Sequence, residues 1–349
     1  MHGIRTRRLR PILAGTAALL AVGLLAGCTS DGSEGDATDR QGTTSDENAA
    51  KGDNVVIGWS GPEADHGWLG AINSGAIAAA DGFDDVELRQ AEGTNDASQQ
   101  IAAVEQFINE KVDAIVLLPT DGAALTEVAM KAMEAGIPVI NVDREFSSTF
   151  ASRATILGDN YGMGVSAGTY ICEQLDGQSD AVVAEIAGID SLPLTQDRSQ
   201  GFKDALEDCG LDVSARVAAD FTVAGGESAA SQLLSANPKI DAIWNHDDDQ
   251  GVGVMAAIDA AGRDDFFLVG GAGSVNMMDR IKADDSVIKA TVIYPSTQAA
   301  DGIALARLIA QGKTMSDLIT PSVPYRIVLD APVVTKDNVD EFIDLAFES

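Results

Sequence analysis

The chain beyond residue 54 alternates short apolar runs with longer stretches in which apolar residues recur every three or four positions. The short runs are typical of buried strands, and the periodic stretches are typical of helices that pack one face on a sheet. After the second run, for example, Ile101, Val104 and Phe107 share one helical face. The alternation predicts an α/β fold of parallel strands and crossover helices. The predicted strands span residues 55–60, 86–91, 113–119, 138–143, 181–187, 213–218, 241–245, 266–270 and 288–294.

These strands fall into two runs, Val55–Asp143 and Ala181–Tyr294, each about the size of one doubly wound sheet. A chain of 349 residues also exceeds the usual size of a single core, which again indicates two domains. The segment 158–162, Gly-Asp-Asn-Tyr-Gly, lies between the two runs and is rich in residues that tolerate unusual backbone angles. We therefore expect two similar lobes with a crossover at this segment.

The chain begins differently, with four arginines between residues 5 and 10 and an apolar run over Ile12–Leu25 that ends in Ala-Gly-Cys28. This order is typical of a lipoprotein signal, in which a peptidase cuts before a cysteine that then carries the lipid. The apolar run is shorter than the ~20 residues of a membrane-spanning helix, which disfavours a transmembrane anchor. We predict a signal peptide over residues 1–27 and a lipid on Cys28. The protein then lies on the extracellular face of the cell membrane, or in the periplasm if an outer membrane is present.

Residues 29–52 contain no Val, Ile, Leu or aromatic side chain and cannot form a core. A flexible segment of this length reaches roughly 25–30 Å. We predict a disordered tether over residues 28–52 that holds the folded part clear of the membrane.

The charge of the exported part limits its partners. Four of the 23 basic residues precede Cys28, so 19 basic and 54 acidic residues remain, with a formal charge of −35. Such an acidic surface disfavours nucleic acid and anionic lipid as partners and favours a neutral or cationic ligand. Contact with the membrane is expected through the lipid anchor only.

Two further cysteines, Cys172 and Cys209, lie near the ends of predicted helices. Outside the cytoplasm such a pair can form a disulfide, provided that the two helix ends are neighbours. The sequence does not decide whether Cys172 and Cys209 are bonded. With only three histidines and no nearby Cys-His pairing, the chain offers no zinc site. We expect no metal and no cofactor.

Polar and aromatic residues follow several predicted strands, where open parallel sheets bind ligands. Carboxylates and an arginine can satisfy sugar hydroxyls, and an aromatic face can cover the C–H side of a sugar ring. The chain has no nucleophile elbow, P-loop, zinc-protease motif or dinucleotide fingerprint, and the aspartates 247–249 lack the spacing of a calcium loop. The pattern therefore favours binding over catalysis. The loops concerned are 63–69, 143–145, 220–221, 246–250 and 294–295.

Several of these segments resemble the type I periplasmic sugar-binding proteins, the family that includes the ribose-binding protein. The resemblance covers nearly all of residues 53–330. It implies two lobes joined by three crossover segments, a ligand enclosed between them, and delivery to an ABC permease. The motifs that carry it are Asp113–Asp121, Ile137–Arg144, Asp159-Asn160 with Gly164 and Gly168, and Arg198 with Gly201-Phe202.

On this resemblance the first lobe comprises residues 53–158 and 295–322, and the second comprises 159–294 and 323–349, with crossovers near Gly158, Tyr294 and Ser322. The residues that match ligand-binding positions of the family are His66, Trp68, Leu69, Asp143, Arg144, Gln196, Phe221, Asp247 and Tyr294.

Two of the matched positions differ from the ribose-type pattern. Gln196 stands where that pattern has an arginine, and Ala272 stands where it has an aspartate. Both changes remove charged partners for hydroxyls, which makes ribose itself doubtful as the ligand. Arg198 is interpreted as a framework arginine.

The sequence thus predicts a lipid-anchored, monomeric binding protein that captures a monosaccharide or polyol between its lobes and delivers it to an ABC permease. One alternative is a receptor that reports a sugar or autoinducer to a signalling partner, which the sequence cannot separate from transport. Another is a surface enzyme that uses a carboxylate pair such as Asp143 and Asp247.

Overall fold

The computed structural model describes residues 46–315 and 322–349, all within one compact unit, residues 42–349. The predicted signal peptide, Cys28 and the tether up to residue 45 lie outside the described residues. Within the described ranges, no helix has the length and apolar character needed to cross a membrane.

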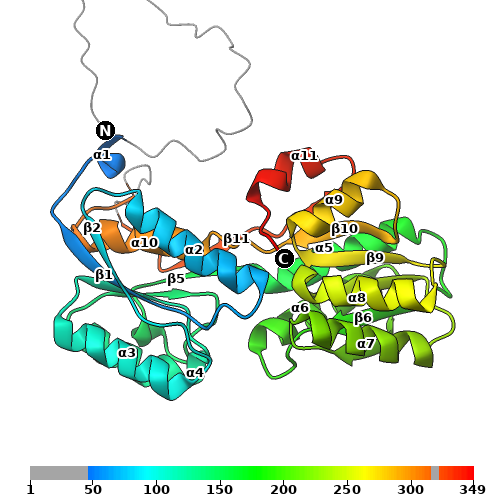
Figure 1. Ribbon diagram of the computed structural model, residues 1–349, viewed down its shortest axis with the longest axis horizontal. Helices are drawn as coiled ribbons and strands as arrows, with labels where there is room; N and C mark the ends of the chain where they lie inside the picture. Colours follow the sequence, from blue (N-terminus) through cyan, green and yellow to red (C-terminus); the bar gives the residue numbers. More distant parts are fainter. Residues whose placement is uncertain (1–45, 316–321) are drawn as a thin grey trace, which may run out of the picture. The chain divides into compact units, whose positions relative to one another are not determined.

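The first lobe is built on a six-stranded parallel sheet in the order β11-β5-β4-β3-β1-β2. Helices α2 and α10 cover one face, and α3 and α4 cover the other (Figure 1). Neighbouring residues of β3 alternate between these faces, since Val116 packs with the first pair of helices and Ile115 with the second. The elements are β1 (Val55–Ser60), α2 (Gly67–Asp81), β2 (Val86–Gln90), α3 (Ala97–Glu110), β3 (Ala114–Leu117), α4 (Gly122–Glu134), β4 (Val139–Val142), β5 (Ala154–Gly158), α10 (Gln298–Ala310) and β11 (Arg326–Leu329).

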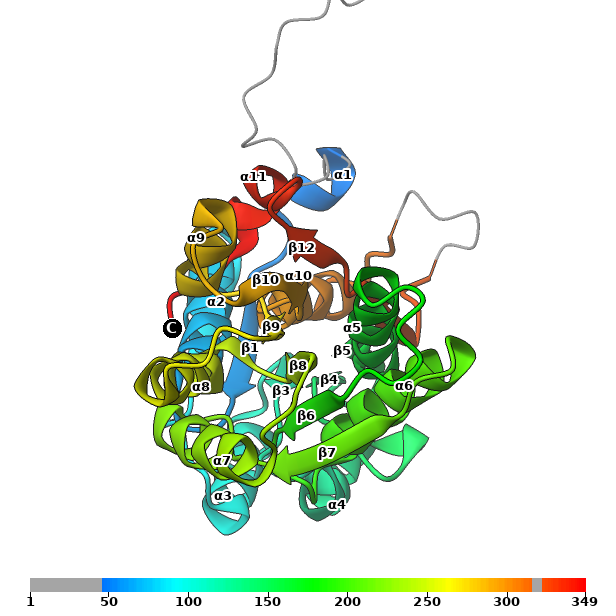
Figure 2. The same cartoon turned by 90° about the vertical axis from the view of Figure 1, so that its right-hand side faces the viewer.

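The second lobe repeats this plan with a sheet in the order β12-β10-β9-β8-β6-β7, in which only β12 is antiparallel to its neighbour. Helices α5 and α6 pack on one face, and α7 and α8 pack on the other (Figure 2). The elements are α5 (Asn160–Gln174), β6 (Val183–Ala187), α6 (Pro193–Asp208), β7 (Val213–Ala218), α7 (Val223–Ala236), β8 (Ala242–Asn245), α8 (Asp248–Ala261), β9 (Phe267–Ala272), α9 (Val275–Ala283), β10 (Ile288–Ile293) and β12 (Val333–Thr335).

Short elements complete the two lobes. They are α1 (Asp46–Ala49), η1 (Thr149–Ala151), α11 (Val339–Phe342) and η2 (Ile343–Leu345). Residues 46–52, which we had assigned to the disordered tether, are instead ordered against the first lobe, since Arg307 donates to the carbonyls of Asn48 and Ala50 and the Gly52 N–H donates to Asp85.

The fold class predicted from the sequence is confirmed. All nine predicted strands are present, and the ends of each differ from the prediction by no more than two residues. Three strands, β5, β11 and β12, were not predicted. Strand β5 is buried along its whole length, but no α-helix separates it from β4, so the strand-helix alternation that marks the other parallel strands is missing.

The third crossover lies later in the chain than expected. Strand β11 pairs with β5 from Arg326 opposite Thr155 to Leu329 opposite Gly158. Residues 323–329, which we had assigned to the second lobe, therefore belong to the first sheet, and the chain crosses at 330–332 instead of near Ser322. The pairing satisfies backbone groups of β5 that would otherwise form an open sheet edge.

The two cysteines of the second lobe are bonded to each other. Helices α5 and α6 pack closely because Gly164 and Gly201 leave room for the backbone of the opposite helix. This packing brings the Cα atoms of Cys172 and Cys209 to 6.2 Å, and their sulfurs form a disulfide. The condition that the helix ends be neighbours is thus met.

Candidate functional site

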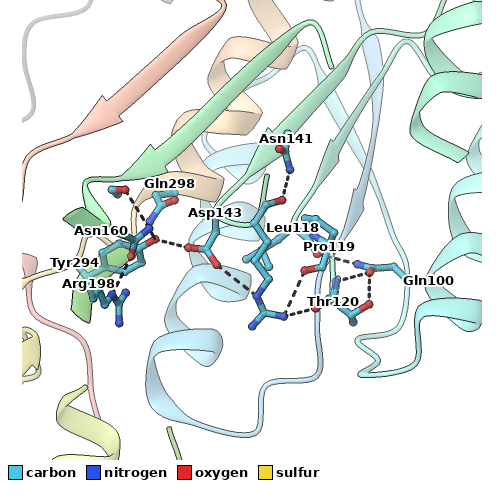
Figure 3. Close-up of polar contacts among 12 residues, drawn as sticks. Gln100, Leu118, Pro119, Thr120, Asn141, Asp143, Asn160, Arg198, Tyr294 and Gln298 are labelled. Atoms are coloured by element: carbon cyan, nitrogen blue, oxygen red, sulfur yellow. Dashed lines mark hydrogen bonds and ion pairs between the residues drawn. The ribbon is translucent and has the colours of Figure 1, made fainter. Parts of the chain in front are cut away.

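Residues that follow strands of both lobes meet in one polar cluster (Figure 3). Asp143, directly after β4, is at its centre. The Tyr294 hydroxyl, after β10, donates a 2.5 Å hydrogen bond to Asp143 Oδ1, and Arg144 Nε lies 3.7 Å from Asp143 Oδ2. Asp143 is buried and has a φ of +62°, a conformation that non-glycine residues adopt at some energetic cost. Such strain is often found where a binding group must be aimed in one direction.

Arg144 is held by the neighbouring loop of the first lobe. One of its terminal nitrogens donates to the carbonyl of Thr120 at 2.9 Å and also lies 3.4 Å from the carbonyl of Pro119. Gln100 fixes that loop, since its side chain donates to the carbonyl of Leu118 and accepts from the Thr120 N–H (Figure 3). Among the described residues the buried Nε of Arg144 has no acceptor within hydrogen-bond distance, and its near neighbour is the Asp143 carboxylate at 3.7 Å.

Arg198 on α6 and Asn160 on α5 extend the cluster into the second lobe. Arg198 Nε donates to Asn160 Oδ1 at 2.9 Å, and Asn160 Nδ2 lies 3.2 Å from the Tyr294 hydroxyl. The Arg198 guanidinium also stacks over the Tyr294 ring at 4.4 Å and donates to the carbonyl of His246. A continuous hydrogen-bonded chain therefore runs from Arg198 to Asp143, across the two lobes.

The pKa of Tyr294 is raised by burial and by the nearby Asp143 carboxylate. The Tyr294 hydroxyl therefore stays protonated at neutral pH and remains a donor to Asp143.

The structure does not bring Gln196 into this polar cluster. This residue is exposed and donates to the carbonyl of Asp190, away from the cluster. Two positions along a helix differ in direction by more than half a turn, so Gln196 and Arg198 cannot face the same site. Arg198, which we had interpreted as a framework residue, replaces Gln196 in the candidate site.

Aromatic side chains form a wall beside the polar cluster. The Trp68 and Tyr294 rings lie 5.4 Å apart, and Trp68 Nε1 donates to the carbonyl of Tyr294 at 3.1 Å. The rings of His66 and Phe221, one from each lobe, are stacked at 6.5 Å. Leu69, also predicted for the site, is buried in the hydrophobic core. Trp68, Tyr294 and Phe221 are buried in this structure. Aromatic rings of this kind can cover the apolar side of a sugar ring.

The three aspartates 247–249 have different partners. Asp247 caps α8 by accepting from the N–H groups of Asp249 and Gln250. Asp248 accepts from the backbone of Gly271 and two further residues and so fixes the turn after β9. Burial, followed by the charges of Asp249 and Asp248, raises the pKa of Asp247. Asp247 is thus a buried carboxyl at the edge of the cluster that also serves as a helix cap.

A cavity of about 540 Å³ opens beside Asp143 and Arg144 and is lined by both lobes, including Asn160 and the loop 191–194. This volume is in the range of small-molecule sites. A cavity of about 630 Å³ lies on the first lobe alone and is lined by Leu88 and other residues, mainly of β2 and α3. Within the described residues, no group of three or more His, Cys, Asp or Glu side chains is placed to hold a metal ion.

Comparison with known proteins identifies the family. The model of the periplasmic binding protein domain matches residues 57–314. The chain belongs to the periplasmic binding protein family. It is 31% identical over 216 residues to the ribose import binding protein of Bacillus subtilis, a match that covers 60% of this chain and 68% of the relative. It is also 31% identical over 267 residues to the D-apiose import binding protein of Actinobacillus succinogenes, covering 75% of this chain and 84% of the relative.

A solved structure of a Mycobacterium smegmatis protein in complex with β-D-fucofuranose is 25% identical and superposes with a TM-score of 0.74. The match covers 83% of this chain and 94% of that protein. The family and the two import binding proteins are solute-binding proteins and not enzymes. The resemblance noted from the sequence motifs is therefore confirmed.

Proposed function

We propose that this protein binds a monosaccharide or a related polyol between its lobes and acts as the solute-binding component of an ABC importer. The observation that carries the proposal is the hydrogen-bonded chain from Arg198 through Asn160 and Tyr294 to Asp143, beside the aromatic wall. Charged groups and amides arranged in this way satisfy hydroxyls as donors and acceptors, while the rings cover C–H groups. The matched relatives, which are named for the import of ribose and D-apiose, support a sugar as the ligand.

Binding is proposed to stabilise a closed arrangement of the lobes. A ligand shifts such an equilibrium only by its preference for the closed form, so it must contact both lobes. Asp143 and Arg144 come from the first lobe, Arg198 and Phe221 come from the second, and Tyr294 lies on a crossover segment. Periplasmic binding proteins are known to close around their ligands by a hinge motion of this kind.

The location and partner are part of the same proposal. A lipid on Cys28 and a tether over residues 28–45 would keep the lobes near the membrane, where a permease of the ABC class receives the ligand. The support for this is the sequence order of arginines, apolar run and cysteine, together with the import function in the names of the relatives. We propose that the protein acts as a monomer.

A thermal-shift screen of the chain against pentoses, hexoses and polyols tests the proposed ligand class, because a ligand of the folded state raises the melting temperature. We expect one group of related sugars to give a shift, and calorimetry to show one site per chain without turnover. Asp143→Ala should abolish that shift and also lower the melting temperature of the unliganded chain, because the buried Tyr294 hydroxyl loses its acceptor. A screen with no sugar or polyol hit would refute the proposed ligand class.

A further inference from the structure

The N-terminal end of α2 has no cap from its own lobe. The first N–H groups of a helix have no partner within the helix and are usually satisfied by the side chain of the N-cap residue. Asp96 and Asp121 do this for α3 and α4. The N-cap of α2 is His66, whose side chain makes no capping hydrogen bond and lies 2.6 Å from Asp65 instead. The first turn of α2 also contains no acidic residue.

Asp249 of the second lobe supplies the missing acceptor. Its Oδ2 accepts a 2.9 Å hydrogen bond from the backbone N–H of Trp68, in the first turn of α2. The side chain is buried, and it also lies in the first turn of α8, so the N-terminal ends of two helices face one carboxylate. The partial positive charge at both helix ends stabilises this negative group. Burial raises the pKa of Asp249, and hydrogen bonds from the backbone of Trp68 and Gly67 oppose that increase.

The approach of the two lobes at this point depends on a glycine. A Cβ atom added to Gly67, the first residue of α2, would lie 2.6 Å from Asp249 Oδ1 and 2.2 Å from the backbone oxygen of Glu348. Both neighbours belong to the second lobe, since the chain around Phe347 pairs with Ser274 before α9. Any larger residue at position 67 would therefore require Asp249 and residues 348–349 of the second lobe to move away from α2.

We propose that Asp249 caps α2 across the interlobe cleft and so stabilises the closed arrangement without touching the ligand. When the lobes separate, the Trp68 N–H loses its acceptor and the end of α2 has to be solvated again. The cap also holds Trp68 where its ring meets Tyr294 and its Nε1 meets the carbonyl of that residue. Asp249 is thus a positioning residue. Its effect on affinity rests on the proposed function, whereas its effect on closure does not.

The affinity test compares substitutions at Asp249 with a matched cap inside one lobe. Asp249→Ala should raise the Kd by about 3- to 30-fold, the range spanned by loss of an N-cap side chain, and by the same factor for every sugar that binds. Asp249→Asn should retain most of the affinity, because asparagine caps helices about as well as aspartate. The control is Asp96→Ala, which removes an exposed cap of α3 made inside the first lobe, and it should lower stability while changing the Kd less than Asp249→Ala does.

The closure test needs no ligand and uses the full-length chain. Of its three tryptophans, Trp59 and Trp244 are buried in the cores of the lobes, and Trp68 lies at the contact between the lobes. Asp249→Ala and Gly67→Ala should both increase quenching of tryptophan fluorescence by acrylamide, since each would expose Trp68 by opening the cleft. Increased quenching in a protein that binds no sugar would support the cap and refute the proposed function.

Two outcomes would overturn the proposal. The first is that acrylamide quenches the tryptophan fluorescence of Asp249→Ala and Gly67→Ala no more than that of the unmodified chain, while Asp249→Ala also leaves the Kd unchanged. The other is a loss of affinity that differs strongly between sugars, since this would place the carboxylate in direct contact with the ligand.

Discussion

Replacement of Arg198 by glutamine is the sharpest test of the candidate site. The substitution removes the donor to Asn160 at 2.9 Å, the donor to the carbonyl of His246, and the charge stacked on Tyr294 at 4.4 Å. A hydrogen bond from a charged group to a ligand contributes about 1.5–3 kcal/mol. At about 1.4 kcal/mol per factor of ten, loss of one such bond should weaken ligand binding about 10- to 150-fold.

Calorimetric titration with the best sugar from the screen measures this change. Gln196→Ala is the matched control, because Gln196 lies two positions earlier on the same helix and is exposed. It should bind with unchanged affinity. Arg198→Lys should recover little of the lost affinity. A lysine cannot donate to both Asn160 and the carbonyl of His246 and stack on the Tyr294 ring at once. Equal losses at positions 196 and 198, or none at Arg198, would refute our placement of the site.

Arg198→Gln should also destabilise the unliganded protein. The side-chain oxygen of Asn160 and the carbonyl of His246 would lose a donor inside a buried region. Leaving a buried acceptor without a partner costs about 1–3 kcal/mol. Urea unfolding should therefore show a lower free energy of unfolding for this variant than for Gln196→Ala. A variant as stable as the unmodified chain would contradict the burial that we assign to these groups.

Three further predictions concern stability and location. Hydrogen bonds from Arg307 hold the pKa of buried Asp85 well below its usual value, so this pair stabilises the fold above about pH 4 and loses its effect as the pH falls further. Asp85→Asn should lower the free energy of unfolding at pH 7, and this free energy should then fall less on acidification than it does in the unmodified chain. Urea unfolding that gives parallel pH profiles for the variant and the unmodified chain would contradict this. Reduction of the Cys172–Cys209 disulfide, which spans 37 residues, should cost about 2–4 kcal/mol in unfolding with no change in Kd, and equal stability would refute a structural role. Cys28→Ala should release the protein from membranes in fractionation, and continued membrane attachment would rule out the lipid anchor.

The sequence alone predicted the fold class, because the signals that define it are local. Apolar spacing within one strand or helix records which face is buried, and this holds wherever the element lies in space. Strand β5 shows the limit of this reasoning. It is apolar and buried, but it follows β4 without an α-helix, and its partner β11 lies about 170 residues later in the chain. Pairing over such a separation has no local sequence signal.

Much of the site was also accessible from sequence, because its residues follow strands and parallel strands end at one edge of a sheet. Asp143, Arg144 and Tyr294 were placed in the candidate cluster in this way. Arg198 was not, because its position depends on the rotation of α6 about its own axis, which only packing against α5 decides. The role of Asp249 was hidden for a similar reason, since its partner at Trp68 lies 181 residues earlier and belongs to the other lobe. Local periodicity thus determined the elements and their order, whereas contacts between distant segments, which depend on how helices and lobes pack, were decided by the tertiary structure.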